Sequence, residues 1–353
     1  MALRLLTYVE QTADHLRSEI SRGRWVDELP GADRLGADLG VNHTTVGAAI
    51  QQLESEGLLI SQGAGRKRKI VLPKDMATPS LRIAILLYER AEVNVDYIVD
   101  LQHRLLEAGH LVTLAPKTLQ DLNMDLNRVQ RIVKQTKTDA WIVKAGSREL
   151  LTWFAEQQIP TMALAGRRRG IMIGGAGPDK APALQEAVQR LVALGHRRIV
   201  MLSRKERRKP SPGQLERTFF TELEKEGIKT GAFNLPDWIE TPEGLNQCLE
   251  SLFRHTPPTA MIIDEVPLFI GVERQLAEFG LLAPRDISLI CMDPSPDFIW
   301  YRQSVSHITW DSRQLVRRIV RWAHNVGRGK ADHHQSFFKA GFVEGGTIGQ
   351  APG

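Results

Sequence analysis

The 353-residue sequence has only two cysteines, Cys248 and Cys291, and no apolar run long enough to cross a membrane. Two isolated cysteines exclude a disulfide framework, and neither lies near histidines at the spacing of a zinc site. A membrane helix needs about 18 consecutive apolar residues, and charges recur every few residues through the first twenty, which excludes the apolar core of a signal peptide. We therefore expect a cytoplasmic protein with no metal site and no membrane partner.

The composition is that of a globular chain, with 42% hydrophobic and 25% charged residues. This length is sufficient for two or three domains with cores of their own. The net charge is +5 and the sequence pI is about 9.2, which favours anionic partners only weakly.

Helical periodicity dominates the first sixty residues. A first amphipathic helix is predicted over residues 3–21, and a short second helix follows Pro30. The third helix follows Asn42, whose side chain can cap it, and ends at Gly57. Its predicted inward face is Val46, Ala49, Ile50 and Leu53, and its predicted exposed face is His43, Thr44, Gly47, Ala48 and Gln51. The second and third helices would form a helix-turn-helix.

The segment after the third helix, LLISQGAGRKRKIV, has the pattern of a strand, a glycine turn and a second strand. Gly63 and Gly65 permit positive φ in the turn, and the basic residues 66–69 can contact phosphates or a narrow minor groove. Apolar-faced helices are often plain core, and a basic run is often a solvated strand end. The order of helix, helix-turn-helix and wing favours a DNA-binding domain instead.

The stretch ELPGADRLGADLGVNHTTVGAAIQQLESEGLL resembles the GntR-family winged-helix signature, over about residues 6–72. His43 and Gly47 stand where that family usually has arginine, so the wing is expected to carry a larger share of binding. The resemblance implies a double-stranded DNA operator as partner. The candidate DNA-contacting residues are Arg34, Asn42, His43, Thr44, Thr45, Gln51, Gly63, Gly65, Arg66, Lys67 and Arg68.

A polar, proline-containing linker is predicted after residue 72, and an alternating pattern begins near residue 81. Seven apolar, strand-like runs alternate with helix-length amphipathic segments, which predicts an α/β fold with parallel sheets in two subdomains. Ligands of such sheets lie beyond the carboxyl ends of the strands. The residues that follow these runs include Tyr88, Glu89, Lys144, Ser203, Arg204, Asp264, Glu265 and Asp293.

The region from residue 81 onward resembles the effector domain of the LacI/GalR family, a periplasmic-binding-protein-like fold. LGHRRI (194–199) and DISLICMD (286–293) are the most specific pieces. The resemblance implies a homodimer and a small-molecule effector such as a sugar, sugar acid or sugar phosphate. Glu265, Val266 and Leu215 depart from the family pattern, and Arg217 lies two residues beyond Leu215. The candidate effector-binding residues are Tyr88, Tyr97, Arg204, Arg217, Glu265, Asp293 and Trp310.

Simpler interpretations exist for several of these residues. Asp293 can cap a turn before Pro294, and Tyr97 and Trp310 can be core aromatics. The segment 203–213 reads most simply as a solvated mobile loop, although at a strand end its Arg204 can pair with an anionic effector. The three arginines 167–169 read as a charged turn, and Asp-His-His at 332–334 is weak evidence for a metal.

The sequence therefore predicts a winged helix-turn-helix (1–72), a linker (73–80) and a two-lobed effector and dimerisation domain (81–353). The predicted function is a ligand-responsive DNA-binding transcriptional regulator, with repression implied by the resemblance alone. One alternative is a regulator whose effector domain only dimerises and senses no small molecule. The other is an α/β enzyme, but no phosphate-binding glycine loop, nucleophile elbow or paired-carboxylate motif occurs, so no enzyme and no cofactor are expected.

Overall fold

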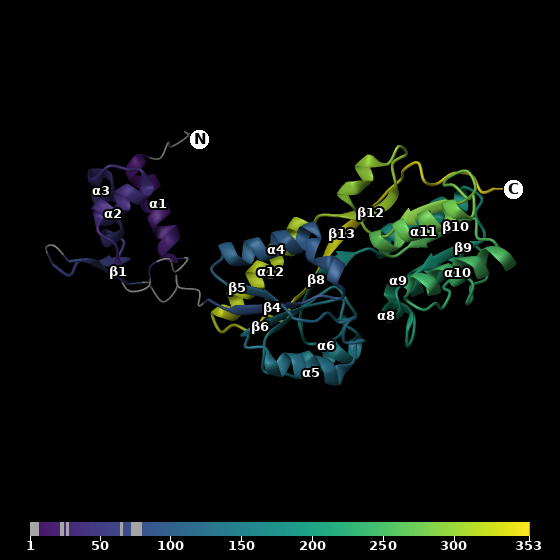
Figure 1. Cartoon of the computed structure of the whole chain (residues 1–353), viewed down its shortest axis with the longest axis horizontal. Coiled ribbons are helices and arrows are strands. Elements are labelled where there is room, and N and C mark those ends of the chain that lie inside the picture. Colours follow the sequence, from purple (N-terminus) through teal and green to yellow (C-terminus); the bar gives the residue numbers. More distant parts are fainter. Residues whose placement is uncertain (1–6, 22–24, 26–27, 64–65, 72–79, 353) are drawn as a thin grey trace. The chain divides into compact units, whose positions relative to one another are not determined.

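The computed structural model describes residues 7–21, 25, 28–63, 66–71 and 80–352, and its contacts divide the chain into two compact units. Unit 1 spans 1–164, 170–174 and 316–334, and unit 2 spans 165–169, 175–315 and 335–353. Of the predicted linker only Ser80 is described, and Gly65 of the predicted wing turn also lies outside the described residues. Figure 1 shows the elements of both units.

Residues 7–71 have a sheet and a hydrophobic core of their own. The elements are α1 (Tyr8–Ser21), β1 (Glu28–Leu29), α2 (Ala32–Leu39), α3 (His43–Ser55), β2 (Leu59–Ile60) and β3 (Arg68–Ile70). The three strands are antiparallel in the order β1-β3-β2. The three helices, the turn and the two wing strands occur where they were predicted, although α1 begins at Tyr8 and residues 3–6 of its predicted start lie outside the described residues. The two-residue β1 was not predicted, because it has no sequence pattern and forms only by pairing with β3.

The tight turn between α2 and α3 depends on glycine. Gly40 has φ +66, in the left-handed region, and its amide donates to the carbonyl of Gly36. A Cβ on Gly36 would lie 2.8 Å from the carbonyl oxygen of Val41, so the two helices could not approach as closely with a larger residue. At the start of α3, Asn42 Oδ1 accepts from the Thr45 amide at 2.7 Å, which confirms the predicted cap.

The rest of unit 1 contains a parallel sheet in the order β5-β4-β6-β7, with helices on both faces. Figure 1 shows α4 and α12 on one side of these strands and α5 and α6 on the other. The elements are β4 (Arg82–Leu86), η1 (Arg90–Asn94), α4 (Asp96–Glu107), β5 (Leu111–Leu114), α5 (Leu126–Gln135), β6 (Ala140–Lys144), α6 (Arg148–Ala155), β7 (Thr161–Leu164) and α12 (Ser312–Gly327), which belongs to unit 1 from Val316 on.

Unit 2 holds the strands β8-β13-β12-β11-β10-β9, in that order, and only the pair β12–β13 is antiparallel. Its elements are β8 (Gly174–Asp179), α7 (Ala181–Ala193), β9 (Ile199–Leu202), α8 (Lys205–Arg208), α9 (Gln214–Lys225), α10 (Pro242–His255), β10 (Ala260–Ile263), α11 (Val266–Glu278), β11 (Ser288–Cys291), η2 (Pro296–Trp300), β12 (Ser306–Trp310) and β13 (Gln335–Val343).

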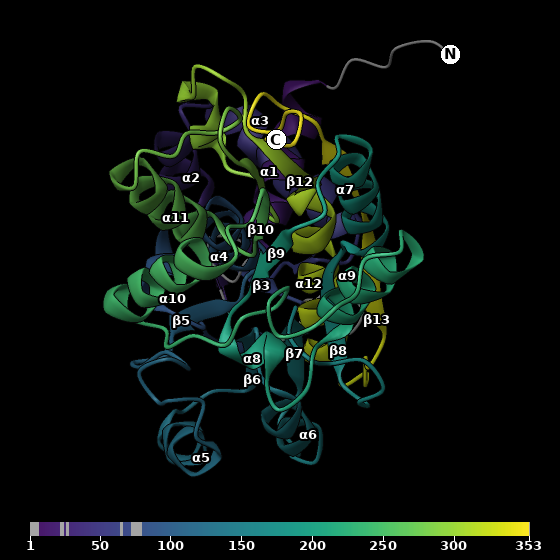
Figure 2. The same cartoon turned by 90° about the vertical axis from the view of Figure 1, so that its right-hand side faces the viewer.

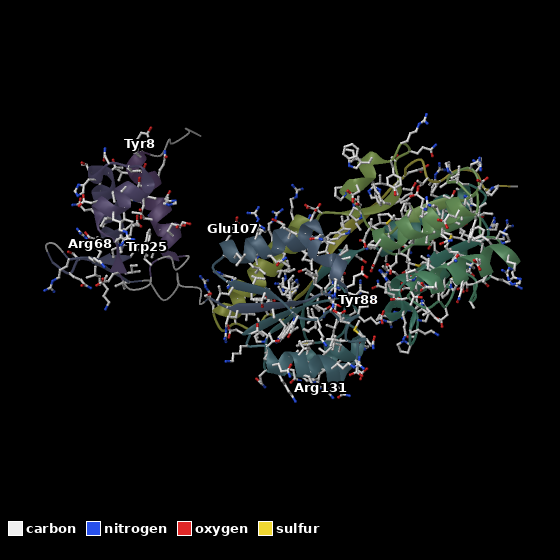
Figure 3. All side chains as sticks on the ribbon, in the orientation of Figure 1. Tyr8, Trp25, Arg68, Tyr88, Glu107 and Arg131 are labelled. Carbon is white, nitrogen blue, oxygen red and sulfur yellow. The ribbon has the colours of Figure 1, made fainter. Side chains whose placement is uncertain are left out.

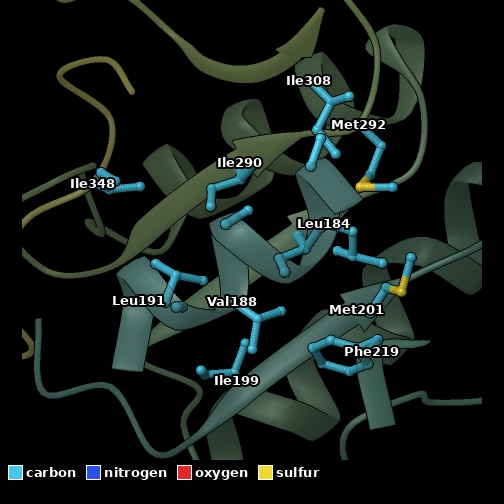
Figure 4. Packing of buried hydrophobic residues seen from close by; sticks show 14 of the residues in the cluster. Leu184, Val188, Leu191, Ile199, Met201, Phe219, Ile290, Met292, Ile308 and Ile348 are labelled. Carbon is cyan, nitrogen blue, oxygen red and sulfur yellow. The ribbon is translucent and has the colours of Figure 1, made fainter. Parts of the chain in front are cut away.

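Alternate side chains of the unit 2 strands enter two separate cores. Ile199 and Met201 of β9 pack with α7 and α9, as Figure 4 shows, whereas Val200 and Leu202 pack with α10 and α11. Figure 2 shows the two helix pairs on opposite sides of β9 and β10. All seven predicted runs are strands, and six of them are buried on both faces, as a continuous apolar run indicates. The seventh, the edge strand β5, alternates exposed and half-buried residues. The strands β8, β12 and β13 were not predicted.

Candidate DNA interface and candidate effector site

The outer face of α3 is polar and accessible. His43, Thr44 and Gln51 are exposed, while the inward residues Val46 and Leu53 are fully buried. This arrangement matches the predicted inward face, and it matches the predicted outward face except at Gly47 and Ala48, which are half-buried. Side chains of this kind, on a helix that follows a tight turn, can reach base edges in a major groove.

The other candidates in the helix-turn-helix have different surroundings. Arg34 is exposed on α2, and Asn42 is exposed although its side chain also caps α3. Thr45 is half-buried, and its backbone amide donates to the Asn42 side chain that caps α3. His43 Nε2 lies 3.6 Å from Asp33 Oδ1, an ion pair only when the histidine is protonated.

The wing carries its charge on the strand β3 and the turn before it. Gly63 has φ +109, and Arg66 and Lys67 are exposed. Arg68 is half-buried and its Nε lies 3.1 Å from Glu54 Oε1 on α3, while Lys67 Nζ lies 3.6 Å from a Glu28 carboxylate oxygen. The Arg68 contact joins the wing to the helix before it. Figure 3 labels Arg68 in this region.

At the carboxyl end of the unit 1 sheet, the ammonium group of Lys144 forms an ion pair with Glu92. Glu92 is 7% exposed, and its Oε2 accepts from the Tyr88 amide at 2.8 Å. The Tyr97 ring lies beside this pair, with its centroid 5.8 Å from Lys144 Nζ. The predicted Tyr88 is a core side chain, since only 5% of its surface is exposed.

Sequence reasoning missed Glu92. The available signal was its spacing from Glu89, because a glutamate three residues after a helix-starting polar residue is typical of a capping box. The structure has that box: the Glu89 side chain accepts from the backbone of Glu92, and the Glu92 side chain accepts from the backbone of Glu89.

At the carboxyl end of the unit 2 sheet, Asp293 follows β11 and is held by two side chains. Lys180 Nζ, at the start of α7, lies 2.6 Å from Asp293 Oδ1, and Trp310 Nε1 donates to the same oxygen at 3.3 Å. The structure thus brings the predicted residues Asp293 and Trp310 together. Lys180 was missed, because it follows the unpredicted strand β8.

Arg204 and Glu265 form a second predicted pair. Arg204 Nη2 lies 3.1 Å from Glu265 Oε2, and Glu240 Oε2 lies 3.8 Å from Arg204 Nη1. The Arg204 side chain is 12% exposed. Two carboxylates of the chain itself therefore neutralise the guanidinium that an anionic effector was predicted to contact.

A third charge cluster centres on Arg207. Its guanidinium contacts the fully buried carboxylate of Asp264, and its Nε lies 3.0 Å from Glu216 Oε1. Burial raises the pKa of Asp264 to about 7, against the opposing effect of Arg207. Burial alone would lower the pKa of Arg207, but the carboxylates of Asp264 and Glu216 raise it above its usual value.

The interpretation of 203–213 as a solvated loop holds only in part, since residues 209–211 are exposed whereas Ser203 and Arg208 are buried. Residues 205–208 form the short helix α8, and Arg208 is 5% exposed with its Nε donating to the carbonyl of Ser203 at 3.1 Å. Arg167 donates to the carbonyls of Glu206, Arg207 and Ser211 at 2.6–2.7 Å. The segment is therefore tied to the rest of unit 2 by Arg167 and by its own Arg208, whose Nη2 also donates to the carbonyl of Trp238.

The interpretation of residues 167–169 as a charged turn fails for its middle member. Arg168 is 5% exposed, lies 4.6 Å from the Phe337 ring centroid, and donates to the Ser336 carbonyl at 3.2 Å. Burial lowers the pKa of Arg168 to about 10. The sequence could not show this burial, because the covering strand β13 was not predicted.

Within the described part of the chain, Arg217 forms no hydrogen bond or ion pair with another candidate effector-binding residue. It is exposed on α9, and its Nη1 donates to the carbonyl of Pro212 at 2.7 Å. Leu215, one of the residues that depart from the family pattern, packs against a core of unit 2.

Within the residues that the structure describes, no group of three or more histidine, cysteine or acidic side chains could hold a metal ion. Asp332, in the Asp-His-His segment, instead accepts from Arg318 at 2.6 Å. The described helices also include none that is long and apolar enough to cross a membrane.

Two family matches cover separate parts of the chain. Residues 8–66 match the bacterial regulatory proteins of the gntR family, and residues 188–348 match a periplasmic binding protein-like domain. These matches agree with the two resemblances in the sequence.

Two curated proteins are similar over part of their length. The HTH-type transcriptional regulator MalR of Streptomyces coelicolor is 24% identical over 201 residues, 56% of this chain. The HTH-type transcriptional regulator reg1 of Streptomyces lividans is 24% identical over 200 residues, 55% of this chain. The match spans 58% of the length of each regulator.

Solved structures share the fold at low identity. A LacI family transcriptional regulator from Enterococcus faecium with bound ribose has a TM-score of 0.61 at 15% identity, covering 77% of this chain and 100% of that one. The lac repressor dimer bound to operator and the anti-inducer ONPF has a TM-score of 0.62 at 18% identity, covering 79% and 99%. At such identity the likeness establishes the fold alone.

Proposed function

Because residues 8–66 are a gntR-type regulatory domain and residues 188–348 a periplasmic binding protein-like domain, we propose that the chain is a DNA-binding transcriptional regulator. The observation that carries the proposal is the winged helix itself. Its α3 presents His43, Thr44 and Gln51 outward, and its wing presents Arg66 and Lys67. The two sets suit base edges and phosphates respectively. The proposed partner is double-stranded DNA. The other proposed DNA contacts are Arg34, Asn42, Thr45, Gly63, Gly65 and Arg68.

Two variants test DNA binding through different signatures. Neutralising residues 66–69 to glutamine weakens binding to every sequence and flattens the salt dependence, by about 0.9 in the slope of log K against log salt for each lost phosphate contact. Gln51→Ala changes the preferred sequence and leaves that slope nearly unchanged. Both are measured by fluorescence anisotropy on selected and unrelated duplexes, and an unchanged salt slope in the wing variant would contradict the assignment.

The proposed mode of action is repression controlled by a sugar or sugar derivative. Support comes from the charged and aromatic residues at the carboxyl ends of the strands: Tyr97 in unit 1, and Asp293 and Trp310 in unit 2. A ligand that prefers one arrangement of a two-lobed domain shifts the population toward it. Differential scanning fluorimetry against sugars, sugar acids and sugar phosphates tests this, because a ligand of the native state raises the melting temperature.

One observation favours the alternative in which the effector domain senses no small molecule. The unit 2 carboxylates at this edge are already held by cations of the chain, since Arg204 binds Glu265, Arg207 binds Asp264 and Lys180 binds Asp293. A ligand must break these pairs or bind beside them. Absence of any thermal shift, with DNA binding intact, would favour this alternative.

The proposed assembly is a homodimer, because two winged heads match the two-fold symmetry of an operator. Ile299 and Trp300 of η2 are 80% and 86% exposed, while Phe298 between them and the core is buried. Exposed apolar and aromatic side chains on an anchored segment are typical of interfaces. Sedimentation analysis tests this: Ile299→Ser with Trp300→Ser shifts the protein toward monomer, whereas the exposed polar change Asp297→Asn does not.

The proposed location is the cytoplasm, where a DNA-binding regulator acts, and the proposed activity includes no catalysis and no cofactor. The described charge clusters are satisfied ion pairs rather than a nucleophile beside a base, which supports a binding function.

A further inference from the structure

The helix α5 (Leu126–Gln135) presents a face made only of hydrogen-bond donors and amides. Arg128, Arg131 and Lys134 are exposed and follow one another at three-residue steps; Figure 3 labels Arg131 on this helix. The amides Asn127 and Gln135 are also exposed. Three-residue steps turn by about 300°, so the three cations cover the outward arc of the helix with Arg131 at its centre.

The opposite side of α5 fixes this orientation. Val129 is 0% and Val133 6% exposed, and both belong to the core that α5 and α6 form against the unit 1 sheet. At the N-terminus, Asp125 Oδ1 accepts from the Arg128 amide at 2.9 Å, so the carboxylate that precedes the helix caps it. The segment 126–138 contains no aspartate or glutamate.

Ion pairs distinguish α5 from the exposed helices α4 and α11. On α4, Arg104 Nε lies 3.3 Å from Asp100 and Nη1 lies 3.1 Å from Glu107; on α11, Arg274 Nε lies 3.1 Å from Glu278. Within the part of the chain that the structure describes, the cations of α5 form no ion pair. A solvated helix face usually mixes both signs of charge, whereas this face carries one sign only.

We propose that α5 is a second DNA-contacting surface, which binds the phosphate backbone of duplex DNA outside the winged helix. Arginine, lysine and side-chain amides are the groups that contact phosphates, and none of these contacts reads sequence. The surface would add affinity to DNA of any sequence. This inference rests on the proposed function, because it assumes that the chain binds DNA.

The test compares three full-length proteins on a long duplex of unrelated sequence over a range of salt concentrations. One is the natural chain, and the second carries Arg128→Gln, Arg131→Gln and Lys134→Gln. The third is a matched control with three other exposed cations neutralised, Lys229→Gln, Arg254→Gln and Arg302→Gln. The α5 variant is expected to lose up to about 2.7 from the slope of log K against log salt, about 0.9 for each phosphate contact, while the control keeps the natural slope.

The outcomes separate the two proposals. If the natural chain binds no duplex, the DNA-binding function fails. If the natural chain binds and the α5 variant keeps its slope, or the control loses as much slope as the α5 variant, the α5 surface is overturned while the proposed function stands. If the partner of α5 is an acidic protein instead of DNA, the α5 variant keeps the natural slope of log K against log salt. Circular dichroism and thermal unfolding of the α5 variant check that its fold is retained.

Discussion

Lys180 Nζ lies 2.6 Å from Asp293 Oδ1, so the carboxylate that the sequence marks for effector hydroxyls already holds an ammonium group of its own chain. Lys180 is 10% and Asp293 29% exposed at the side chain. Trp310 Nε1 donates to the same oxygen. A sugar hydroxyl that binds Asp293 would therefore share the carboxylate or displace one of these donors.

Asp293→Asn leaves the buried Lys180 ammonium without its carboxylate. We expect a loss of about 1–3 kcal/mol in the free energy of unfolding, less than for a fully buried pair because Asp293 is partly exposed. Urea unfolding at neutral pH measures it. Asp297→Asn, an exposed acid four residues along, is the control and should change stability by less than about 0.5 kcal/mol. Equal losses in the two variants would contradict the structural role of the pair.

Asp264 should make stability depend on pH. Burial raises its folded pKa to about 7, whereas an unfolded aspartate has a pKa of about 3.9. Between these values the native state binds more protons than the unfolded state, so this contribution to stability falls as pH rises from about 4 to about 7. Asp264→Asn removes that slope. Unfolding free energies of both proteins across the range measure the difference, and parallel curves would rule the effect out.

Asp139 provides a control of opposite sign. Hydrogen bonds from Arg82 lower the pKa of Asp139 to about 2. The native state then binds fewer protons than the unfolded state, so this contribution to stability is present above about pH 4 and is lost as pH falls toward 2. Asp139→Asn therefore lowers stability by a constant amount above about pH 4 and flattens the acid limb of the stability curve, while the slope between pH 5 and 7 is unchanged; urea unfolding across this pH range measures both.

Asn42→Ala should loosen the start of α3. The change removes the acceptor of the Thr45 amide, at a cost of about 1 kcal/mol, or roughly fivefold faster amide exchange where exchange follows local opening. Hydrogen–deuterium exchange of a peptide covering α3 measures this. Asn42→Asp keeps an acceptor and should exchange at nearly the natural rate. A matching increase in that variant would show that the cap is not the cause.

Arg168→Ala should destabilise unit 2 by about 2 kcal/mol through lost packing on Phe337 and the lost bond to the Ser336 carbonyl. Arg169 is the matched control, since its guanidinium lies 4.3 Å from the same ring centroid but its side chain is 52% exposed. Arg169→Ala should cost less than about 1 kcal/mol. The two are compared by urea unfolding, and a larger loss at Arg169 would contradict the burial argument.

Local patterns in the sequence determined much of the fold. The cap at Asn42, the inward residues Val46 and Leu53 of α3, and seven strands, six of them buried, follow from signals within a few residues of each other. Such signals work because a cap is a local hydrogen bond. A buried helix face requires apolar residues at three- and four-residue steps, and a strand buried on both sides requires a continuous apolar run, so both patterns can be recognised in the sequence.

Tertiary structure alone decided the rest. The segment 174–179 contains three glycines and a proline, yet it is the strand β8 because β13, some 160 residues later, pairs with it. Burial of Arg168 and the pairing of Lys180 with Asp293 depend on these strands. Pairing between residues so distant in the chain produces no periodic pattern in the sequence. The sequence therefore indicated which residues follow the strands, whereas only the tertiary structure determined that their charged side chains form ion pairs with one another.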